Sequence, residues 1–274
     1  AADTVRAAVR GQDMIVHAAD VGAGSRSARD RQQQVDASAS LYRAACEAGV
    51  QRWIGFSALL ARGADALPTG DPDTDLRLET ERCLRAAEQT DGTRIIILRL
   101  ACVYGPGVKR WTVEPIIQAQ QQRLRMPGSG AYAFPYLYIE NLVDAVTAAA
   151  AADACGTYDV FDGVTSYAEY LGHYARMAGT HVRSLPLPVL MGLGWLEEMQ
   201  RRWLGRFPRF TRAGLRSQLR DLPPEPPYAE KALRELGWQP RVSLEEGMAS
   251  IERSNGFHEP AAKQDVNPWK ENEN

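Results

Sequence analysis

Long apolar stretches are missing from this sequence. No uninterrupted apolar run reaches the roughly 18–20 residues that a membrane-spanning helix needs. The best candidate, LPLPVLMGLGWL at 185–196, is short and is broken by proline and glycine. We therefore expect no membrane span in these 274 residues.

Closely spaced cysteines are also missing. The four cysteines lie far apart, at Cys46, Cys83, Cys102 and Cys155, and no C-x-x-C pair occurs. A metal site or a disulfide framework is therefore not expected, and reduced thiols in a cytoplasm fit better. A surplus of one charge is lacking too, because the net charge is -2 and the isoelectric point about 6.2. The net charge therefore gives no general attraction to nucleic acid or to an anionic membrane.

Strand and helix patterns alternate along most of the chain. Short apolar runs at Met14–Ala18, Trp53–Ser57 and Ile95–Leu100 predict strands, and helical patterns separate them. The segment RIIILRL is too apolar for a strand with one wet face, so we expect it to be buried on both faces. This alternation predicts an α/β fold built on a doubly wound parallel sheet.

Helix ends are marked by local signals. Gly49 follows an amphipathic pattern and is expected to stop a helix. Ser166 with Glu169, and Ser243 with Glu246, have the spacing of capping boxes. Each pair predicts a helix that begins at the serine.

The alternation stops near residue 178. From about residue 185 the pattern is mainly helical and rich in loops, and LPPEPP at 222–227 breaks it. We expect a dinucleotide-binding domain over 1–178, a substrate lobe over 179–258 and a flexible tail over 259–274.

Five segments, in this order and spacing, resemble the extended short-chain dehydrogenase/reductases, in particular the NAD-dependent epimerase/dehydratase and 3β-hydroxysteroid-dehydrogenase-like group. The segments are GQDMIVHAAD, AACEAGVQRWIGFSA, LRLACVYGPG, YLYIENLVDAV and KALRELGWQPRVSLEEGM. The resemblance implies a Rossmann-like domain with a smaller C-terminal lobe. It speaks for the fold more strongly than for one reaction.

The glycine fingerprint of that family is absent. The family holds the cofactor's phosphates on a Gly-x-x-Gly-x-x-Gly turn at a helix N-terminus. The only glycine-rich candidate, VGAGSRS at 21–27, follows the strand that resembles the fourth of the family's sheet. A surface loop is the better interpretation of it. The first βαβ unit of the family is therefore missing, and we expect residues 1–274 alone to bind NAD(P) weakly or not at all.

The family's catalytic serine, tyrosine and lysine are altered as well. The resemblance puts Ala58 at the serine position, with Ser57 just before it, Asp73 at the tyrosine position and Arg77 at the lysine position. Arginine can bind hydroxyls but cannot shuttle protons, because its pKa is too high. Asp73 could act as a base. We take Ser57, Asp73 and Arg77 as candidate catalytic residues.

No shift of the alignment restores the missing tyrosine. No tyrosine occurs between Tyr42 and Tyr104. Simpler roles stay open for the candidates: Ser57 could satisfy a local backbone group, and Asp73 with Arg77 could form an ordinary helical ion pair.

The resemblance also implies binding residues. NAD or NADP would contact His17, Ala18, Ala19, Arg77 and Val103. His17 could equally be a packed histidine at a strand end.

Tyr104, Tyr136 and Arg209 are candidate substrate residues, with core packing the alternative for Tyr104. Between residues 201 and 220 there are seven arginines and no acidic residue. This run could hold a phosphate-bearing or carrier-linked substrate, or it could be a solvated face. Trp195, Trp203 and Phe207 are expected in the core of the lobe rather than on a surface that stacks nucleic-acid bases.

Two functions from different classes follow. The first is an NAD(P)-dependent oxidoreductase or epimerase that acts on a small hydroxylated or carbonyl substrate. The second is a non-redox descendant of the fold: an isomerase, cyclase, lyase or binding protein that uses the old cleft without hydride transfer. The expected partner is a small molecule, not nucleic acid, and a homodimer stays open.

Overall fold

The fold is taken from a computed structural model of the chain. It describes residues 2–18, 28–59, 72–91, 93–203, 212, 215–216 and 229–255.

Four parallel strands form the main sheet, in the order β1–β2–β3–β7. Their bounds are Met14–His17 (β1), Arg52–Ala58 (β2), Arg94–Leu100 (β3) and Gly156–Val160 (β7). The register pairs Trp53 with Ile95 and Ala58 with Leu100. The prediction that the first three strands are parallel neighbours is confirmed. Residues 95–98 of β3 are all buried, as expected for a strand covered on both faces.

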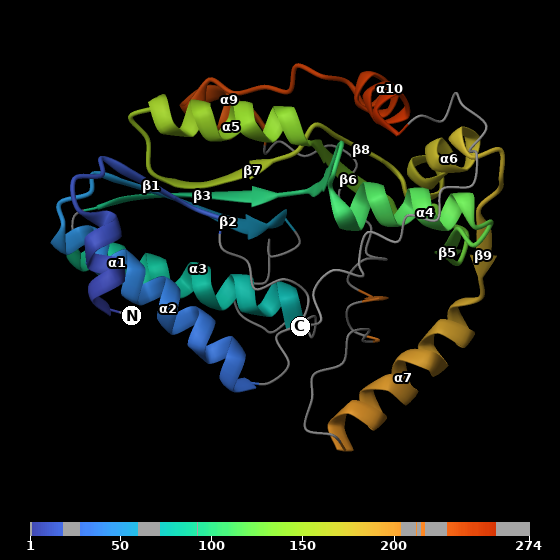
Figure 1. The fold of residues 1–274 in the computed structure, drawn as a ribbon, viewed down its shortest axis with the longest axis horizontal. Helices are drawn as coiled ribbons and strands as arrows, with labels where there is room; N and C mark the ends of the chain where they lie inside the picture. Colours follow the sequence, from blue (N-terminus) through green and yellow to red (C-terminus); the bar gives the residue numbers. More distant parts are fainter. Residues whose placement is uncertain are drawn as a thin grey trace, which may run out of the picture.

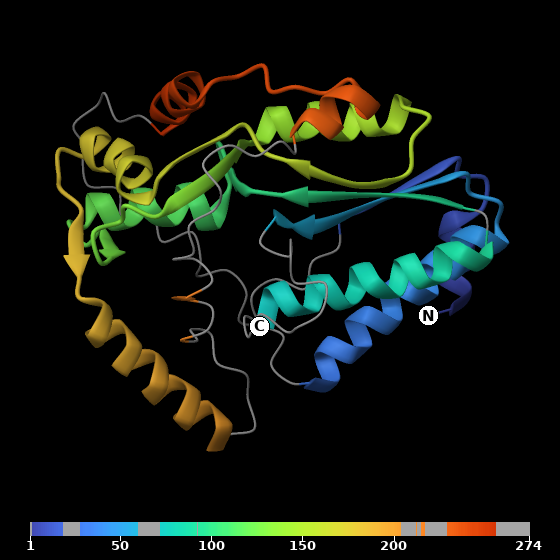
Figure 2. The same cartoon turned by 180° about the vertical axis from the view of Figure 1, so that it is seen from behind.

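Helices cover both faces of this sheet (Figure 1, Figure 2). One face carries α2 (Ala28–Glu47) and α3 (Pro72–Asp91), with α1 (Ala2–Val9) packed on α2. The other carries α5 (Ile139–Ala151) and α9 (Ala229–Leu236). Two aliphatic cores result, one on each side of the strands. The fold class predicted from the alternation, α/β with a doubly wound parallel sheet, is confirmed.

The end of α2 shows why a glycine is needed there. Gly49 has a φ of +76°, a conformation that L side chains rarely adopt. Its N–H donates to the carbonyl of Cys46 at 3.0 Å, and the N–H of Val50 donates to that of Ala45 at 3.0 Å. These two bonds close the last turn, so the predicted helix stop is confirmed.

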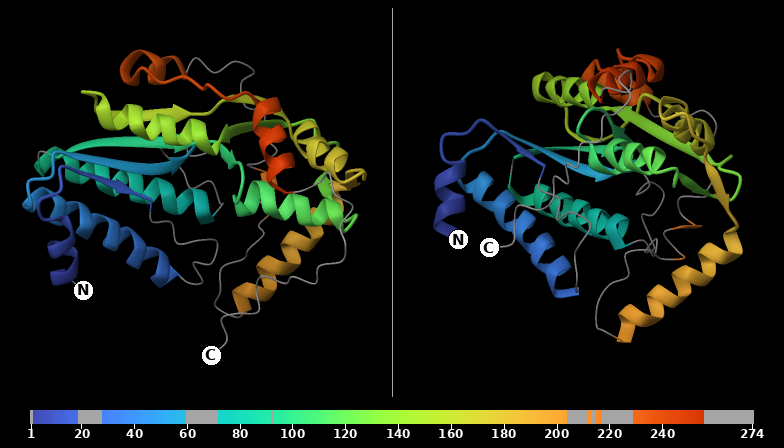
Figure 3. Two further views of the ribbon diagram at one scale, coloured as in Figure 1. Left: turned by 45° about the horizontal axis from the view of Figure 1, so that its top comes forward. Right: turned by 45° about the vertical axis from the view of Figure 1, so that its right-hand side comes forward.

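A second, smaller region continues from the end of β3 (Figure 3). Its strands are β4 (Cys102–Tyr104), β6 (Ala133–Tyr138) and β8 (Gly163–Ser166) in one sheet, and β5 (Arg125–Pro127) and β9 (Arg183–Leu185) in another. Its helices are the π-helical turn η2 (Lys109–Val113), α4 (Glu114–Gln120), α6 (Tyr167–Met177) and α10 (Leu244–Ser254). Aromatic side chains dominate its core.

The two predicted capping boxes have different outcomes. Ser243 and Glu246 form both bonds of the box at the start of α10, so that prediction is confirmed. At the start of α6 only half of the box forms. Ser166 accepts from the N–H of Glu169, but the Glu169 carboxylate accepts from the Thr165 hydroxyl instead.

The C-terminal elements are divided between the two regions. Helix α9 packs against β7 and α5 of the main sheet, whereas β9 pairs in parallel with β5, and α10 packs in the second region. The division at residue 178 stays a prediction.

Helix α7 (Leu187–Trp203) follows β9 and extends away from the main sheet (Figure 1). Trp195 and Trp203 on this helix are exposed, so the prediction that they lie in the core of the lobe is wrong. Phe207, predicted in the same core, lies outside the described residues. No described helix is long and apolar enough to cross a bilayer.

Candidate functional site

The C-terminal ends of β1, β2 and β3 form one edge of the main sheet, here called the strand edge. The register places His17 opposite Gly55, and Ser57 opposite Arg99. In open α/β sheets ligands bind beyond the carboxyl ends of the strands. Most of the site residues predicted from the sequence belong to this edge or to the segments that follow it.

Ser57 is the most informative residue of the strand edge. Its side chain is 1% exposed, and its hydroxyl has no hydrogen-bond partner. Leaving a buried hydroxyl without a partner costs about 1–3 kcal/mol, so such a group calls for an explanation. In this conformation the Ser57 hydroxyl reaches no solvent, and its catalytic role stays a prediction.

Helix α3 is fixed to the sheet by a buried ion pair that follows from no pattern in the sequence. The Arg99 guanidinium donates to both carboxylate oxygens of Glu81, at 2.9 and 3.2 Å. Glu81 is almost fully buried, and the Thr157 hydroxyl lies 3.5 Å from it. Because Arg99 is the register partner of Ser57, this pair holds α3 close beside the strand edge.

Arg77 and Asp73 precede Glu81 by one and two helical turns. Residues four apart lie on the same helix face. Arg77 is half-buried on α3. Asp73 lies in the first turn of α3, and its side chain falls outside the described part of the chain. The catalytic roles of both residues stay predictions.

The cofactor candidates sit at the end of β1 and at β4. His17 is half-buried, and its ring centroid lies 5.0 Å from that of Trp53. Burial lowers the pKa of His17, which favours the neutral ring. Ala18 is exposed directly after β1, and Ala19 lies outside the described residues. Val103 is half-buried in β4.

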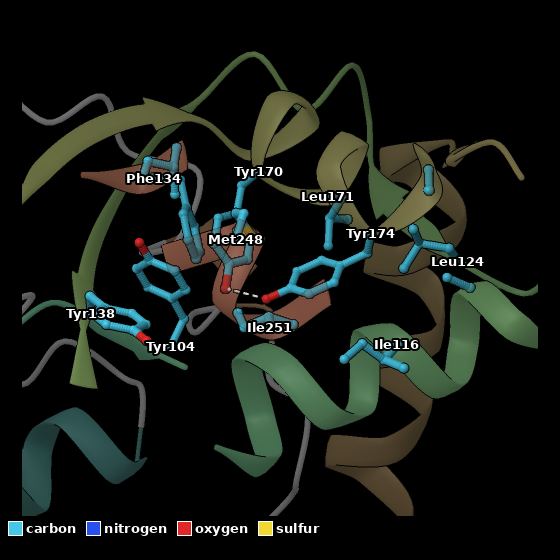
Figure 4. Close-up of a cluster of buried hydrophobic side chains, with 13 residues drawn as sticks. Tyr104, Ile116, Leu124, Phe134, Tyr138, Tyr170, Leu171, Tyr174, Met248 and Ile251 are labelled. Carbon is cyan, nitrogen blue, oxygen red and sulfur yellow. Dashed lines mark hydrogen bonds between the residues drawn. The ribbon is translucent and has the colours of Figure 1, made fainter. Parts of the chain in front are cut away.

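Tyr104 lies inside the aromatic core rather than on the surface. Its side chain is 0% exposed and contacts the rings of Tyr136, Tyr138 and Tyr170 at centroid distances of 6.0, 5.4 and 6.0 Å. Figure 4 shows Tyr104 with Tyr138 and Tyr170, near Met248 and Ile251 of α10. Its hydroxyl has no hydrogen-bond partner, and it lies 2.5 Å from where a Cβ on Gly247 would stand. In this conformation Tyr104 reaches no solvent, and its substrate role stays a prediction.

Tyr136 and Arg209 are the remaining substrate candidates. Tyr136 is half-buried on β6, and its hydroxyl lies 2.6 Å from where a Cβ on Gly163 would stand. Burial, and then the charge of Asp162, raise the pKa of Tyr136. Arg209 lies outside the described residues.

Asp162 is a polar group near the edge that the sequence reasoning missed. It comes two residues after β7, and its carboxylate accepts from the N–H of Tyr138 at 2.6 Å. Its other oxygen has no partner. Burial raises the pKa of Asp162 to about 6, although hydrogen bonds from Tyr138 and Asn141 act in the opposite direction. An aspartate directly after a buried strand, in GTYDVFDG, was the available signal.

The described residues outside the strand edge were considered for a metal site and for a pocket. Among the described residues, no group of three or more His, Cys, Asp or Glu side chains is arranged to hold a metal ion. A hollow of about 460 Å³ opens between α1 and α2, beside Val5, Leu41 and Arg43, and none of its lining residues belongs to the strand edge.

Comparison with known proteins decides the family. The sequence profile of the NAD dependent epimerase/dehydratase family matches residues 1–161, more than half of the chain. The chain belongs to this family. The resemblance inferred from the five segments is thereby confirmed. A curated relative is the 3-diazoavenalumate denitrifying reductase of a Streptomyces species. It is 27% identical over 177 residues, and the match covers 59% of this chain and 58% of the relative.

Solved structures agree with the fold of this family member. The UDP-glucose 4-epimerase of Thermotoga maritima, determined with UDP-glucose, has a TM-score of 0.69 at 19% identity, over 92% of this chain and 80% of its own. The dTDP-glucose 4,6-dehydratase of Streptomyces venezuelae, determined with NAD, has a TM-score of 0.67 at 20% identity, over 92% and 76%. At these identities the likeness is one of fold, and it confirms the Rossmann-like class.

Proposed function

We propose that this chain is an NAD(P)-dependent oxidoreductase or epimerase that acts on a small hydroxylated or carbonyl substrate at the strand edge. The observation that carries the proposal is the buried, unpartnered hydroxyl of Ser57. A hydroxyl at that position can donate to a substrate oxygen, which polarises a carbonyl and stabilises the negative charge that develops on it.

The nicotinamide half of a dinucleotide is proposed to bind at the strand edge, where the cofactor would supply the hydride. His17, Ala18, Ala19 and Val103 are the residues proposed to contact it. Arg77, carried on the helix that the Glu81–Arg99 pair anchors, would bind the ribose hydroxyls.

The diphosphate half has no such support in these 274 residues, because the sequence contains no Gly-x-x-Gly-x-x-Gly turn. A diphosphate is held in this family by backbone N–H groups at a helix N-terminus. Dinucleotide binding by this chain alone should therefore be weak, with NAD and NADP held similarly.

Proton movement falls to Asp73, since helix α3 contains no tyrosine. Asp73, in the first turn of α3, is the proposed base that would take a proton from a substrate hydroxyl. The Arg77 guanidinium would orient an anion or a hydroxyl without exchanging a proton.

The substrate is proposed to be a small molecule with hydroxyl or carbonyl groups, which a nucleotide sugar would satisfy. The structural neighbours determined with UDP-glucose support that class. Tyr136 would contact it from β6, and Arg209 is the candidate for a phosphate group. Tyr104 would not contact the substrate itself. It would hold the ring of Tyr136 in position through their contact.

One observation supports a second, non-redox function. The residues at the tyrosine and lysine positions are Asp73 and Arg77, which can act as base and anion binder without hydride transfer. A non-redox isomerase, cyclase or lyase would need only these groups.

Deuterium transfer separates the two functions. The chain is incubated with NAD(P)H deuterated at C4 and a mixture of small carbonyl and hydroxylated compounds, and the products are analysed by mass spectrometry. The proposal expects deuterium in one product. It also expects Asp73→Asn to lower kcat by about 100-fold, the usual scale for a general base. Glu79→Gln, at an exposed position on the same helix, is the matched control and should leave kcat unchanged. An epimerase would instead return the substrate's own hydride and would need NAD(P)+. A substrate consumed equally well with no nicotinamide cofactor, and without deuterium transfer, would favour the non-redox function.

A further inference from the structure

An aromatic cluster lies at the edge of the core of the second region. Its members are Trp111 on η2, Tyr132 before β6, Phe134 on β6 and Tyr167 on α6. The Tyr132 and Tyr167 rings are stacked, with their centroids 5.4 Å apart. The Phe134 ring lies 5.1 Å from that of Trp111 and 5.2 Å from that of Tyr167. Phe134 is buried, and Figure 4 shows it beside Tyr170 of the deeper core. The other three side chains of the cluster are half-buried, so part of each reaches the surface.

Two hydroxyls of the aromatic cluster are available as donors. Within the described part of the chain, no hydrogen bond engages the hydroxyl of Tyr132 or of Tyr167. Deeper in the same core, the hydroxyls of Tyr170 and Tyr174 both donate to the carbonyl of Trp111. Burial raises the pKa of Tyr167 to about 12, so its hydroxyl stays protonated near neutral pH and can donate. The edge of the core therefore combines ring surface with hydrogen-bond donors.

A cation is held on this cluster. The Arg110 guanidinium lies over the Trp111 ring, with its central carbon 5.1 Å from the ring centroid, which is the geometry of a cation–π contact. Arg110 is exposed, and no carboxylate of the described residues forms an ion pair with it, Glu114 four residues on included. The ring restricts the guanidinium, while its N–H groups can still donate to a planar anion. Arg110 is therefore prepared to bind a carboxylate.

The Arg110 charge also reaches two neutral groups of this edge. Burial raises the pKa of the Cys102 thiol to about 12, and the charge of Arg110 acts in the opposite direction. Arg110 likewise opposes the raised pKa of Tyr167. The thiol and the phenol both stay protonated near neutral pH, so neither of them competes with an anionic ligand for Arg110.

Cys102 connects the aromatic cluster to the strand edge. It is the first residue of β4, two residues after β3 ends at Leu100. Cys102 packs against the aromatic core, whereas Val103 packs against the aliphatic core of the main sheet. Successive side chains of a strand alternate in this way. The register puts Cys102 opposite Tyr136, the proposed substrate contact on β6. A ligand on the cluster would therefore lie beside the start of β4, next to the strand edge.

We propose that the aromatic cluster binds a planar aromatic ring of the substrate, and that Arg110 binds a carboxylate carried by that ring. This inference rests on the proposed function, and it narrows the substrate to an aromatic carboxylic acid that also carries the reacting carbonyl or hydroxyl. Aromatic rings attract one another in offset or edge-on arrangements, which half-buried rings can offer to a ligand. A nucleotide sugar fits less well. Its diphosphate is multiply charged and its sugar is polar, whereas the cluster presents rings and, within the described structure, one stacked arginine.

Ligand binding to the full 274-residue chain tests this proposal without any cofactor. The probe is para-acetylbenzoate, which combines a ring, a carboxylate and a carbonyl, and binding is followed by saturation-transfer NMR. Para-acetylbenzamide lacks the charge, and the cyclohexane analogue of the acid lacks the aromatic ring. We expect the acid to bind with a Kd of ~1 mM or tighter. Each of the other two compounds should bind about fivefold more weakly, because one of the two recognised features is missing.

Three variants identify the groups involved. Arg110→Gln should weaken binding of the acid about tenfold and leave binding of the amide unchanged, because only the acid uses the charge. Arg123→Gln, at an exposed arginine just after α4, is the matched control and should bind like the wild type. Tyr132→Leu should weaken binding of the acid and of the amide alike, about fivefold, because a ring is lost. Thermal melting should confirm that each variant folds, since the substituted side chains are exposed or half-buried.

Uridine diphosphate separates an aromatic acid from a nucleotide sugar. Uridine diphosphate that binds more tightly than the acid, and that loses affinity in Arg110→Gln, would overturn the proposal and assign the cluster to a nucleotide. Equal binding of the acid, the amide and the cyclohexane analogue would overturn it as well, and so would acid binding that Arg110→Gln leaves unchanged. The titration contains no cofactor, so its result is independent of deuterium transfer from NAD(P)H. Binding as expected therefore supports this subsite even where the redox function fails.

Discussion

The core beside the main sheet and the core of the second region, here called the tyrosine-rich region, are built from different side chains. In the sheet, β2, β3 and β7 bury mainly Ile, Leu and Val side chains against α5 and α9, and the one tyrosine of this core, Tyr158, has a hydroxyl that donates to the Glu235 carboxylate. In the second region the buried residues include Tyr104, Tyr138, Tyr170 and Tyr174. Each tyrosine brings a hydroxyl that must find a partner or remain unsatisfied.

Some tyrosine hydroxyls of the tyrosine-rich region have a hydrogen-bond partner and others have none. The hydroxyls of Tyr170 and Tyr174 both donate to the carbonyl of Trp111, at 2.5 and 2.8 Å (Figure 4 shows the two hydroxyls). This carbonyl belongs to the π-helical turn η2, where the regular helical bonding changes. The hydroxyl of Tyr104, in the same cluster, has no partner. The sheet therefore depends on volume, and the tyrosine-rich region depends on which hydroxyls are paired.

The largest expected effect concerns the buried ion pair between Glu81 and Arg99 on the sheet side. Arg99→Met should lower the free energy of unfolding by about 3 kcal/mol or more, because Glu81 remains buried without its main partner. The double variant Glu81→Met, Arg99→Met should recover most of that loss, since an apolar pair of similar volume replaces the charges. Urea denaturation of the wild type and both variants measures this. A double variant as unstable as Arg99→Met would contradict the role assigned to the pair.

A smaller effect, dependent on pH, is expected where the two regions meet, at Asp162. Its folded pKa of about 6 lies above the usual value of 3.8, so the folded state binds the proton more tightly than the unfolded chain does. This contribution is fully present below about pH 4 and is lost as the pH rises through 6. Asp162→Asn removes the titration. Relative to the wild type, it should be about 2–3 kcal/mol more stable at pH 8 and equally stable at pH 4.

Urea denaturation of the wild type and Asp162→Asn across this pH range gives the comparison directly. A difference in stability that does not change with pH would contradict the burial assigned to this carboxylate.

The smallest expected changes in stability come from removing a hydrogen-bonded and an unpaired tyrosine hydroxyl. Tyr174→Phe should cost about 1 kcal/mol of stability, because a hydrogen bond to the Trp111 carbonyl is lost. Tyr104→Phe should be neutral or slightly stabilising, because the hydroxyl it removes has no partner. Thermal unfolding of the two variants, at one pH, provides the test. Equal losses in both variants would mean that the Tyr104 hydroxyl finds a partner in solution.

The sequence predicted the aliphatic part of the fold better than the rest. RIIILRL is apolar at almost every position, so its burial on both faces could be inferred from composition alone. The first turns of α2, ARDRQQQ, contain no apolar periodicity, so no helix could be predicted there. Trp203 was expected inside because a large aromatic residue is usually buried, and local sequence does not report which face of α7 meets the chain.

The candidate site was predicted in outline only. The family resemblance located Ser57 and Arg77 because they occupy recognisable positions in the segments. It did not reveal the Glu81–Arg99 pair or the contact of Asp162 with Tyr138. These contacts join residues 18 and 24 positions apart, and only the folded sheet brings them together.

The strand edge as the site of a nicotinamide group is the central claim. Its most direct test is a titration of residues 1–274 with NADH and with reduced nicotinamide mononucleotide, followed by saturation-transfer NMR. With a ribose and nicotinamide site but no diphosphate turn, the two ligands should bind with similar dissociation constants of ~1 mM or weaker. Arg77→Gln should weaken both about tenfold, the scale of a charged hydrogen bond. Micromolar NADH binding that far exceeds mononucleotide binding, and that Arg77→Gln leaves unchanged, would contradict the account.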